Sequence, residues 1–355
     1  MVINKREVKE IHKLLKKTIV HPDVFVKWCC GERDELIRIL KPLEQYIWHH
    51  YPDKLFRFRT INNYSLDALE NDSVYMTRAD LFNDPYDGFL SFDAVKMKCS
   101  IADNLSDEKM ERVLSERNVQ FPMGELFKTK DEYLKDFRKK RADFLKECST
   151  ILPNVTVELQ RNTYVASLTE NIASPVMWAH YAKNHSGFAI EYQFREEMFS
   201  LQPMIVPNED YNWYGWRSIL PVFYSNTRAD GTMLASWLSL CKWFNAYLGS
   251  EHKEFDMSQY LTDLLLKTKL CLQKSEEWSY EREWRLMISH NWPNYVGNKA
   301  CHLCYPPSGI YLGDKISKWD KRLLFDIAKA KKIPVYQMYL DQAGKEYKME
   351  YKPAL

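Results

Sequence analysis

The chain has 355 residues, with 50 Lys and Arg against 48 Asp and Glu, so its formal net charge is only +2. This balance excludes a uniformly basic nucleic-acid coat protein and an acidic disordered tail. Aromatic residues make up 14% of the chain, whereas only 11 residues are glycine. Neither the G-x-G-x-x-G fingerprint nor the G-K-[ST] ending of a P-loop occurs, so side chains would have to hold the phosphates of any bound nucleotide.

The N-terminal segment is charged throughout and lacks the apolar core of a signal peptide. No stretch approaches the roughly eighteen apolar residues of a membrane span. The eight cysteines follow no disulfide framework. We therefore expect a cytoplasmic protein with no membrane partner.

In chain order, residues 1–50 have the three- and four-residue apolar spacing of a helical N-terminal segment, and 51–355 read as a single α+β domain. Helical insertions are expected at about 105–150 and 232–275. Strands are expected where β-branched or aromatic runs are bounded by polar, Pro or Gly residues. These runs are 55–59, 74–77, 164–169, 187–192, 220–224, 284–289, 310–313 and 335–340.

Three polar clusters lie on these apolar strands, where an unpaired polar group is costly unless it faces a cleft or a partner. The first is Arg57 and Arg59 in FRFR, whose alternation places both arginines on one face and two phenylalanines on the other. The second is Ser167 and Thr169 in YVASLTEN. The third is the Glu281-Arg282-Glu283 segment at the start of a hydrophobic strand.

In this order the clusters resemble the R…S-x-T…E-x-E pattern of the ADP-ribosyltransferase fold, a split antiparallel β-sandwich that binds NAD without a glycine loop. The resemblance implies an NAD-dependent ADP-ribosyltransferase or NAD glycohydrolase, an enzyme of the kind used as a toxin or in phage defence. NAD would be the substrate, the acceptor a protein or a nucleic acid, and no metal is expected. The oligomeric state stays open.

The chemistry is consistent with that implication, because breaking the nicotinamide–ribose bond passes through an oxocarbenium-like state that a nearby carboxylate stabilises. By the family pattern, Glu283 would stabilise this cation and hold the ribose, and Glu281 would orient or deprotonate the acceptor. Arg57 or Arg59 would bind the pyrophosphate. The pattern also assigns Ser167 and Thr169 to hydrogen bonds with Glu283 or the ribose, and Tyr181 is the first candidate to stack on nicotinamide.

An alternative interpretation of the same residues is structural. Glu281 and Glu283 would then form an ion-pair network with Arg57, Arg59, Arg282 and Arg285. Such a network would connect two sheets and need no substrate.

The order of blocks from LFRFR to IYLG, residues 55–313, also resembles a bacterial family, the domain-of-unknown-function 2971 family. The shared blocks include VYMTRADLFNDPYD and SPVMWAHYAKNHSGFAIEY. This resemblance implies no settled activity. It does place all three polar clusters within the signature blocks of one family.

Two further blocks supply candidates with open alternatives. His180 is a candidate general base or NAD contact, the alternative being a hydrogen-bonded core histidine. Asn83 and Asp84 are candidate NAD-binding residues, the alternative being a turn in which they bond their own backbone.

Two other functions remain open at this point. A metal-dependent nuclease or phosphodiesterase would use Mg²⁺ on Asp84, Asp87, Glu191 and the two glutamates of the E-x-E segment. A non-catalytic interaction module of a bacterial defence system would use the aromatic residues as a partner surface.

Overall fold

The computed structural model describes the chain in segments. These are residues 5–19, 45, 49–108, 111, 130–161, 163–193, 203–208, 211–232, 235–236, 239–240, 243, 271–289 and 300–354. Most of the expected helical segment 1–50 and most of the expected insertion at 232–275 therefore lie outside the described residues.

Several of the described helices begin with a side-chain cap. Asn62 and Ser65 form a reciprocal capping box, and Ser174 and Ser317 each accept a backbone N–H bond at a helix start. The helices are α1 (Lys5–Ile19), α4 (Asn63–Glu70), α5 (Ala94–Asn104), α7 (Lys130–Arg161), α8 (Pro175–Tyr181) and α11 (Lys318–Lys331), and the 3-10 turns are η1 (Ala79–Leu81) and η4 (Glu276–Glu281).

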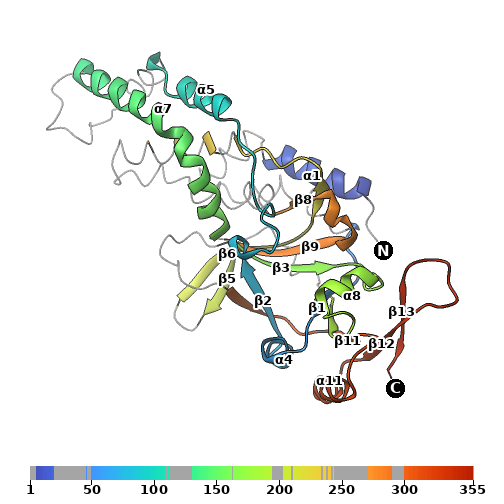
Figure 1. Ribbon diagram of the computed structural model, residues 1–355. Coiled ribbons are helices and arrows are strands. Elements are labelled where there is room, and N and C mark those ends of the chain that lie inside the picture. The colour runs from blue at the N-terminus through green and yellow to red at the C-terminus, as the bar shows by residue number, and fades with distance from the viewer. Residues whose placement is uncertain are drawn as a thin grey trace.

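Eleven of the described strands pair into one mostly antiparallel sheet, and two more form a separate ribbon. The α+β class is thereby confirmed (Figure 1). The sheet strands are β1 (Leu55–Arg59), β2 (Ser73–Arg78), β3 (Thr163–Thr169), β4 (Phe188–Tyr192), β5 (Pro203–Asn208), β6 (Tyr211–Pro221), β9 (Glu283–Ser289), β10 (Ala300–Cys304), β11 (Gly309–Leu312), β12 (Val335–Leu340) and β13 (Met349–Pro353), and the ribbon consists of β7 (Phe223–Ser225) and β8 (Gln273–Ser275).

The sheet divides at β3. Strand β9 pairs with β3 along its whole length, from Thr163 to Thr169. The opposite edge of β3 is shared, because β2 pairs at Tyr164 and Val165 whereas β1 pairs only at Thr169. Strands β1 and β2 therefore diverge from each other on either side of Ser167.

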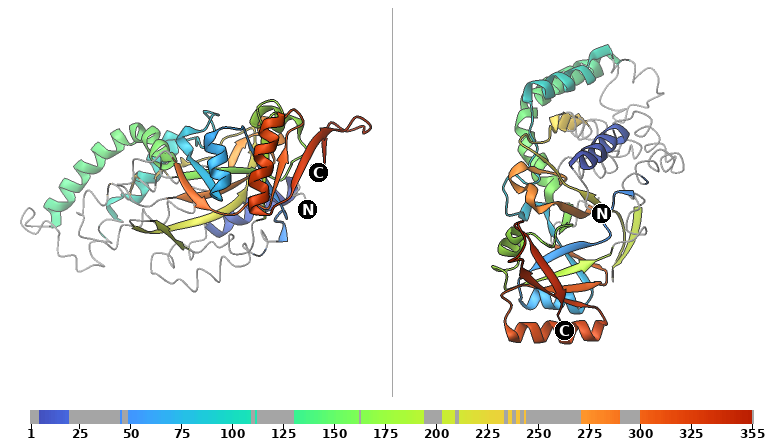
Figure 2. Two further views of the ribbon diagram at one scale, coloured as in Figure 1. Left: turned by 90° about the horizontal axis from the view of Figure 1, so that it is seen from below. Right: turned by 90° about the vertical axis from the view of Figure 1, so that its right-hand side faces the viewer.

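Side chains of the β1, β4 and β11 part of the sheet alternate between two packed faces, as strand geometry requires. On one face, Phe188 and Ile310 pack with residues of α11, in the largest buried cluster. On the other face, Ala189 and Tyr311 pack with Phe56, Phe58 and residues of α8. Figures 1 and 2 show α11 at one end of the molecule and the hairpin β12–β13 beside it.

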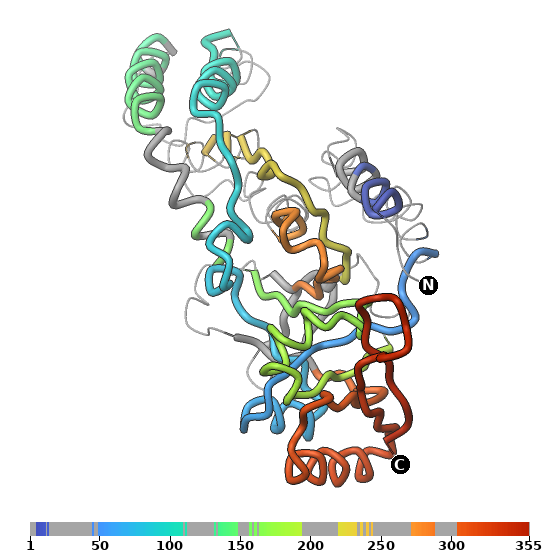
Figure 3. The backbone as a smooth tube through the Cα atoms, turned by 45° about the vertical axis from the view of Figure 1, so that its right-hand side comes forward, coloured from blue at the N-terminus to red at the C-terminus, as the bar shows by residue number. Residues whose placement is uncertain are grey.

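Helices α5 and α7 extend away from the sheet and have a cluster of their own (Figure 3). Met97 and Ile101 of α5 pack there against Leu134 and Phe137 of α7. Within the expected helical insertion at about 105–150, residues 109–110 and 112–129 lie outside the described residues, and α7 spans Lys130–Arg161.

The expected strands all occur, with ends shifted by a residue or two, except that 220–224 is divided between β6 and β7. The elements not expected from the sequence pattern include strands β5, β8, β10 and β13 and helices α5 and α11. None of the described helices combines the length and the apolar character needed to cross a membrane.

Candidate functional site

A cavity of about 350 Å³ lies along β3, where β1 and β2 diverge from each other. Eight of the ten predicted site residues line it: Arg57, Arg59, Asn83, Ser167, Thr169, Tyr181, Glu281 and Glu283. The two others do not. His180 is exposed, and Asp84 lines a neighbouring cavity.

The two glutamates reach one lysine although they belong to different elements. Glu281 ends η4 and Glu283 begins β9, with Arg282 between them in the left-handed conformation at φ 44°. This turn brings both carboxylates to Lys274, whose Nζ lies 2.7 Å from Glu281 Oε2 and 3.4 Å from Glu283 Oε2. All three side chains are almost fully buried.

Glu283 is also paired along its own strand. Arg285, two residues further on the same face of β9, donates from Nε to Glu283 Oε1 at 2.7 Å. The same guanidinium binds Asp87 through both terminal nitrogens, at 2.8 and 2.5 Å. Although burial favours the neutral acid, Arg285, Lys274 and a hydrogen bond from Ser167 together lower the pKa of Glu283 from its usual 4.5 to about 2. Glu283 is therefore an anion at neutral pH.

Glu281 has the opposite electrostatic balance. Burial and the charge of Glu283 raise its pKa, against the opposing effects of Lys274 and Tyr181. The hydroxyl of Tyr181 donates to Glu281 Oε1 at 2.5 Å, and Thr169 donates to the Glu281 carbonyl oxygen at 2.6 Å. Burial and the bond to Glu281 in turn raise the pKa of Tyr181. A carboxylate with a raised pKa is the kind of group that works as a general base.

The two arginines of β1 form the cationic side of the cavity. Arg57 donates across the divergence to the carbonyl oxygen of Tyr75 on β2. Burial and the neighbouring Arg59 lower the pKa of Arg57, and burial lowers that of Arg59. Within the described part of the chain, neither guanidinium has a carboxylate within ion-pair distance. Two buried cations without an anionic partner are suited to bind a phosphate.

The structural alternative is correct for part of the cluster. Arg285 does form an ion-pair network, with Glu283 and Asp87. Arg57 and Arg59 do not join it, and Arg282 is exposed. The network therefore holds the two glutamates in place and leaves Arg57 and Arg59 of β1 available to bind a ligand.

The remaining predicted residues have local roles in this structure. His180 Nδ1 lies 3.1 Å from the hydroxyl of Tyr280, and its exposure rules out the core-histidine alternative. Asp84 Oδ1 accepts the backbone N–H of Tyr86 at 2.9 Å, which is the turn geometry given as the alternative for this residue.

Three more residues complete the site: Asp87 and Arg285, which the sequence offered only as a Mg²⁺ ligand and as an ion-pair partner of the glutamates, and Lys274, which it did not predict. Arg285 had a signal, because a residue two positions after Glu283 shares its strand face. Asp87 lies in the same turn block as Asn83. Lys274 had no signal, because it is brought to the glutamates by the pairing of β8 with β7.

Of the five carboxylates considered for a Mg²⁺ site, Asp87, Glu281 and Glu283 gather around Lys274, whereas Asp84 and Glu191 lie apart from them. Glu191 bonds Lys54, Ser308 and Tyr311, and it does not line the cavity. Among the residues that the structure describes, no group of three or more His, Cys, Asp and Glu side chains is arranged to hold a metal ion.

The chain was compared with protein families, curated proteins and solved structures. The model of the family described as protein of unknown function DUF2971 matches residues 177–286. This match confirms the resemblance to the DUF2971 family that the order of motifs indicates. No curated protein and no solved structure matches the chain.

The DUF2971 match is shorter than the expected span of 55–313. It contains Tyr181, Lys274, Glu281 and Glu283, and the arginines of β1 lie outside it. The cavity is thus built jointly by the DUF2971 segment and the preceding part of the chain.

Proposed function

We propose that this protein cleaves NAD at the nicotinamide–ribose bond and transfers ADP-ribose to an acceptor or to water. The observation that carries the proposal is a separation of charge within one cavity. Arg57 and Arg59 line one part of it without carboxylate partners, and Glu281 and Glu283 line another. NAD has the complementary pattern, an anionic pyrophosphate next to a ribose that becomes cationic.

The net charge around the glutamates is negative. Three carboxylates, Asp87, Glu281 and Glu283, share two cations, Lys274 and Arg285. One negative charge is left over in a buried site, where water screens it little. This charge would stabilise an oxocarbenium ion in the transition state more than neutral NAD-ribose in the ground state.

In the proposed reaction, the bond between ribose C1′ and the nicotinamide nitrogen breaks, and its electron pair leaves with nicotinamide. The charge of Glu283 stabilises the resulting cation. The acceptor then attacks C1′ with a lone pair, and Glu281 takes the proton that the acceptor loses. Arg57 and Arg59 hold the pyrophosphate, so that C1′ stays at the glutamates.

The divided sheet also supports an ADP-ribosyltransferase-like arrangement. Strand β3 carries Ser167 at the point where β1 and β2 diverge, and the cavity opens there. In the resemblance noted above, NAD binds at such a split without a glycine loop. Backbone and side-chain groups at the split, rather than a helix N-terminus, would contact the substrate.

The test is release of free nicotinamide from NAD by the full chain, with and without protein and nucleic-acid acceptors. Glu283→Gln keeps the shape of the side chain and removes its charge, so the rate should fall by about 10²-fold or more. Glu191→Gln is the matched control, because Glu191 is equally buried and ion-paired but lies outside the cavity. Folded Glu191→Gln protein should retain the wild-type rate.

Two results would exclude the proposal. One is the absence of nicotinamide release under every acceptor condition. The other is an unchanged rate in Glu283→Gln.

A further inference from the structure

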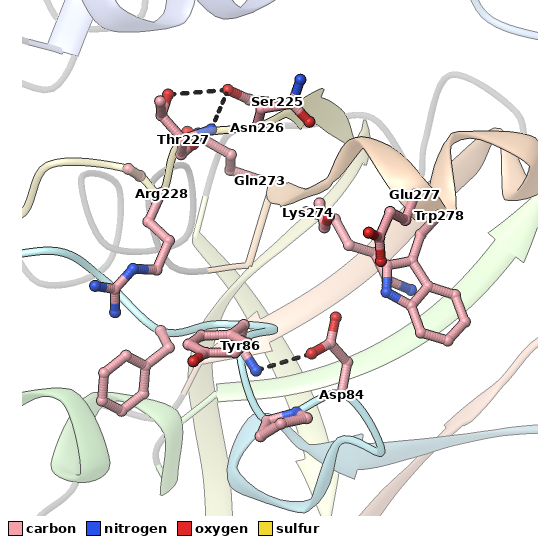
Figure 4. A pocket seen from close by; sticks show the side chains of 14 residues that line it. Asp84, Tyr86, Ser225, Asn226, Thr227, Arg228, Gln273, Lys274, Glu277 and Trp278 are labelled. Carbon is pink, nitrogen blue, oxygen red and sulfur yellow. Dashed lines mark hydrogen bonds between the residues drawn. The ribbon is translucent and has the colours of Figure 1, made fainter.

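A second cavity, of about 560 Å³, adjoins the NAD-binding candidate. The two share Lys274, and the turn that contributes Asn83 to the first contributes Asp84 to the second. Figure 4 shows Arg228 and Tyr86 on one side of this cavity and Lys274, Glu277 and Trp278 on the other. Nothing in the proposed NAD chemistry uses these side chains apart from Lys274.

Aromatic rings with an unpaired guanidinium form one side of the second cavity. Arg228 lies 5.7 Å from the ring centres of both Tyr86 and Phe89. Tyr86 is 65% exposed and Phe89 is 39% exposed. Among the described residues, Arg228 has no carboxylate within ion-pair distance. Exposed rings beside a free arginine are the features that bind single-stranded nucleic acid, by stacking on a base and neutralising its phosphate.

Two carboxylates among the lining residues supply hydrogen-bond acceptors. Asp84 uses Oδ1 for the N–H of Tyr86, and its other oxygen has no hydrogen-bond partner in the described part of the chain. Glu277 is exposed at the same cavity. Carboxylates accept hydrogen bonds from amino groups on the edges of cytosine and adenine, whereas thymine offers no amino group.

We infer that the second cavity binds an unpaired nucleobase that carries an amino group, within a single strand of nucleic acid. Tyr86 stacks on the base, Asp84 accepts from its amino group, and Arg228 pairs with the adjoining phosphate. This inference rests on the proposed function. It adds to it that the acceptor of ADP-ribose is a nucleic acid.

The position of Lys274 connects the two cavities. Its ammonium group lies 4.7 Å from the ring centre of Trp278 and 2.7 Å from Glu281 Oε2. Trp278, which lines the second cavity, is therefore separated from Glu281 of the first cavity by one lysine side chain. In the transfer step, the base nitrogen forms a bond to ribose C1′, nicotinamide leaves with the electrons of the broken bond, and Glu281 accepts the proton of the nitrogen.

The experiment measures binding of fluorescently labelled 12-mers of dC and dT to the full chain by anisotropy, over a range of salt concentrations. Tyr86→Ala should weaken dC binding by about tenfold, as expected for loss of one stacked base. Arg228→Ala should reduce the slope of log affinity against log salt by about one. Asp84→Asn should remove the preference for dC over dT.

Two exposed residues far along the chain provide matched controls. Tyr347→Ala removes a fully exposed ring, and Arg322→Ala removes an exposed arginine of α11. Both variants should bind dC as the wild type does. Nicotinamide release into water by Tyr86→Ala should also equal that of the wild type.

The inference is overturned if dC does not bind, or if Tyr86→Ala and Arg228→Ala bind it like the wild type. Modification of a protein acceptor without oligonucleotide binding would overturn it and leave the proposed function standing. Conversely, oligonucleotide binding that depends on Tyr86 and Arg228, without any NAD cleavage, would remove the proposed function and keep the nucleobase site.

Discussion

At the scale of single residues, Arg285 is the centre of the buried cluster. It is 1% exposed, and it holds both Asp87 and Glu283, which are almost 200 residues apart in the sequence. Phe82 lies below it, 5.0 Å from ring centre to guanidinium carbon. Removing one partner of a buried ion pair typically costs about 3–5 kcal/mol, because the other charge stays buried. The charges of the site are therefore held by a rigid local network.

The lowered pKa of Glu283 predicts acid sensitivity. Because this pKa falls from 4.5 to about 2 on folding, its ionisation stabilises the folded protein fully above about pH 4.5. That contribution is lost as the pH falls toward 2. Glu281 has the opposite effect on stability. Because folding raises its pKa, its ionisation as the pH rises lowers the free energy of unfolding.

Urea unfolding of the wild type and of Glu283→Gln between pH 2 and pH 5 measures this contribution. The wild type should lose free energy of unfolding more steeply than Glu283→Gln as the pH falls. Parallel curves for the two proteins would show that Glu283 is not held as an anion by the fold.

At the scale of elements, the position of Arg59 depends on the turn that follows α8. Lys183, Asn184 and His185 all have left-handed φ angles, of 48°, 54° and 69°. This turn brings Gly187 against β1, so close that a Cβ atom on it would lie 2.2 Å from the Arg59 carbonyl oxygen. The absence of a side chain at Gly187 thus permits the pairing of β1 and β4 that positions the arginines.

Gly187→Ala should therefore push the backbone of Arg59 away from its observed position. We expect a loss of about 1–3 kcal/mol in unfolding free energy, the usual cost of overpacking, and weaker NAD binding by calorimetry. Gly309→Ala is the matched control on β11, because a Cβ there would meet its nearest atoms at an ordinary 3.6 Å. Equal effects of the two substitutions would contradict this explanation.

At the scale of the whole molecule, the sheet and the arm formed by α5 and α7 have separate buried clusters. The arm extends away from the sheet in Figures 1 and 3. Regions with their own cores open with their own free energies. The arm should therefore be able to unfold locally while the cavity between β1, β2 and β3 stays intact.

Phe137→Ala tests this independence. Phe137 is fully buried in the arm, so its truncation should cost the arm about 3–5 kcal/mol. Hydrogen exchange should accelerate in α5 and α7 and stay unchanged in β3 and β9. Phe188→Ala, a truncation equally buried in the sheet cluster, should accelerate exchange in the sheet instead. Uniform acceleration by Phe137→Ala would show one cooperative unit.

Most strands of the first and last thirds of the chain could be predicted from the sequence, because alternation of apolar and polar residues is a local pattern. The alternation in FRFR is a property of four residues, and it recurs in the structure with Phe56 and Phe58 in one cluster. Strand β10 was missed because its segment, ACHLC, has no clear alternation of apolar and polar residues. The bounds of α7 were missed because its apolar spacing continues beyond the most highly charged segment.

The sequence by itself determined which strands carry polar side chains and that no glycine loop is available for phosphates. Only the tertiary structure decided which of those side chains meet. The pairing of β3 with β9, β1 and β2 gathers residues more than a hundred positions apart, and no local pattern encodes it. For the same reason the pairing of Asp87 with Arg285, across 198 positions of sequence, and the contact of Lys274 with both glutamates appeared only in the folded structure. Which charges pair inside the core is decided by the topology, because a buried charge can pair only with a group that the fold places within reach.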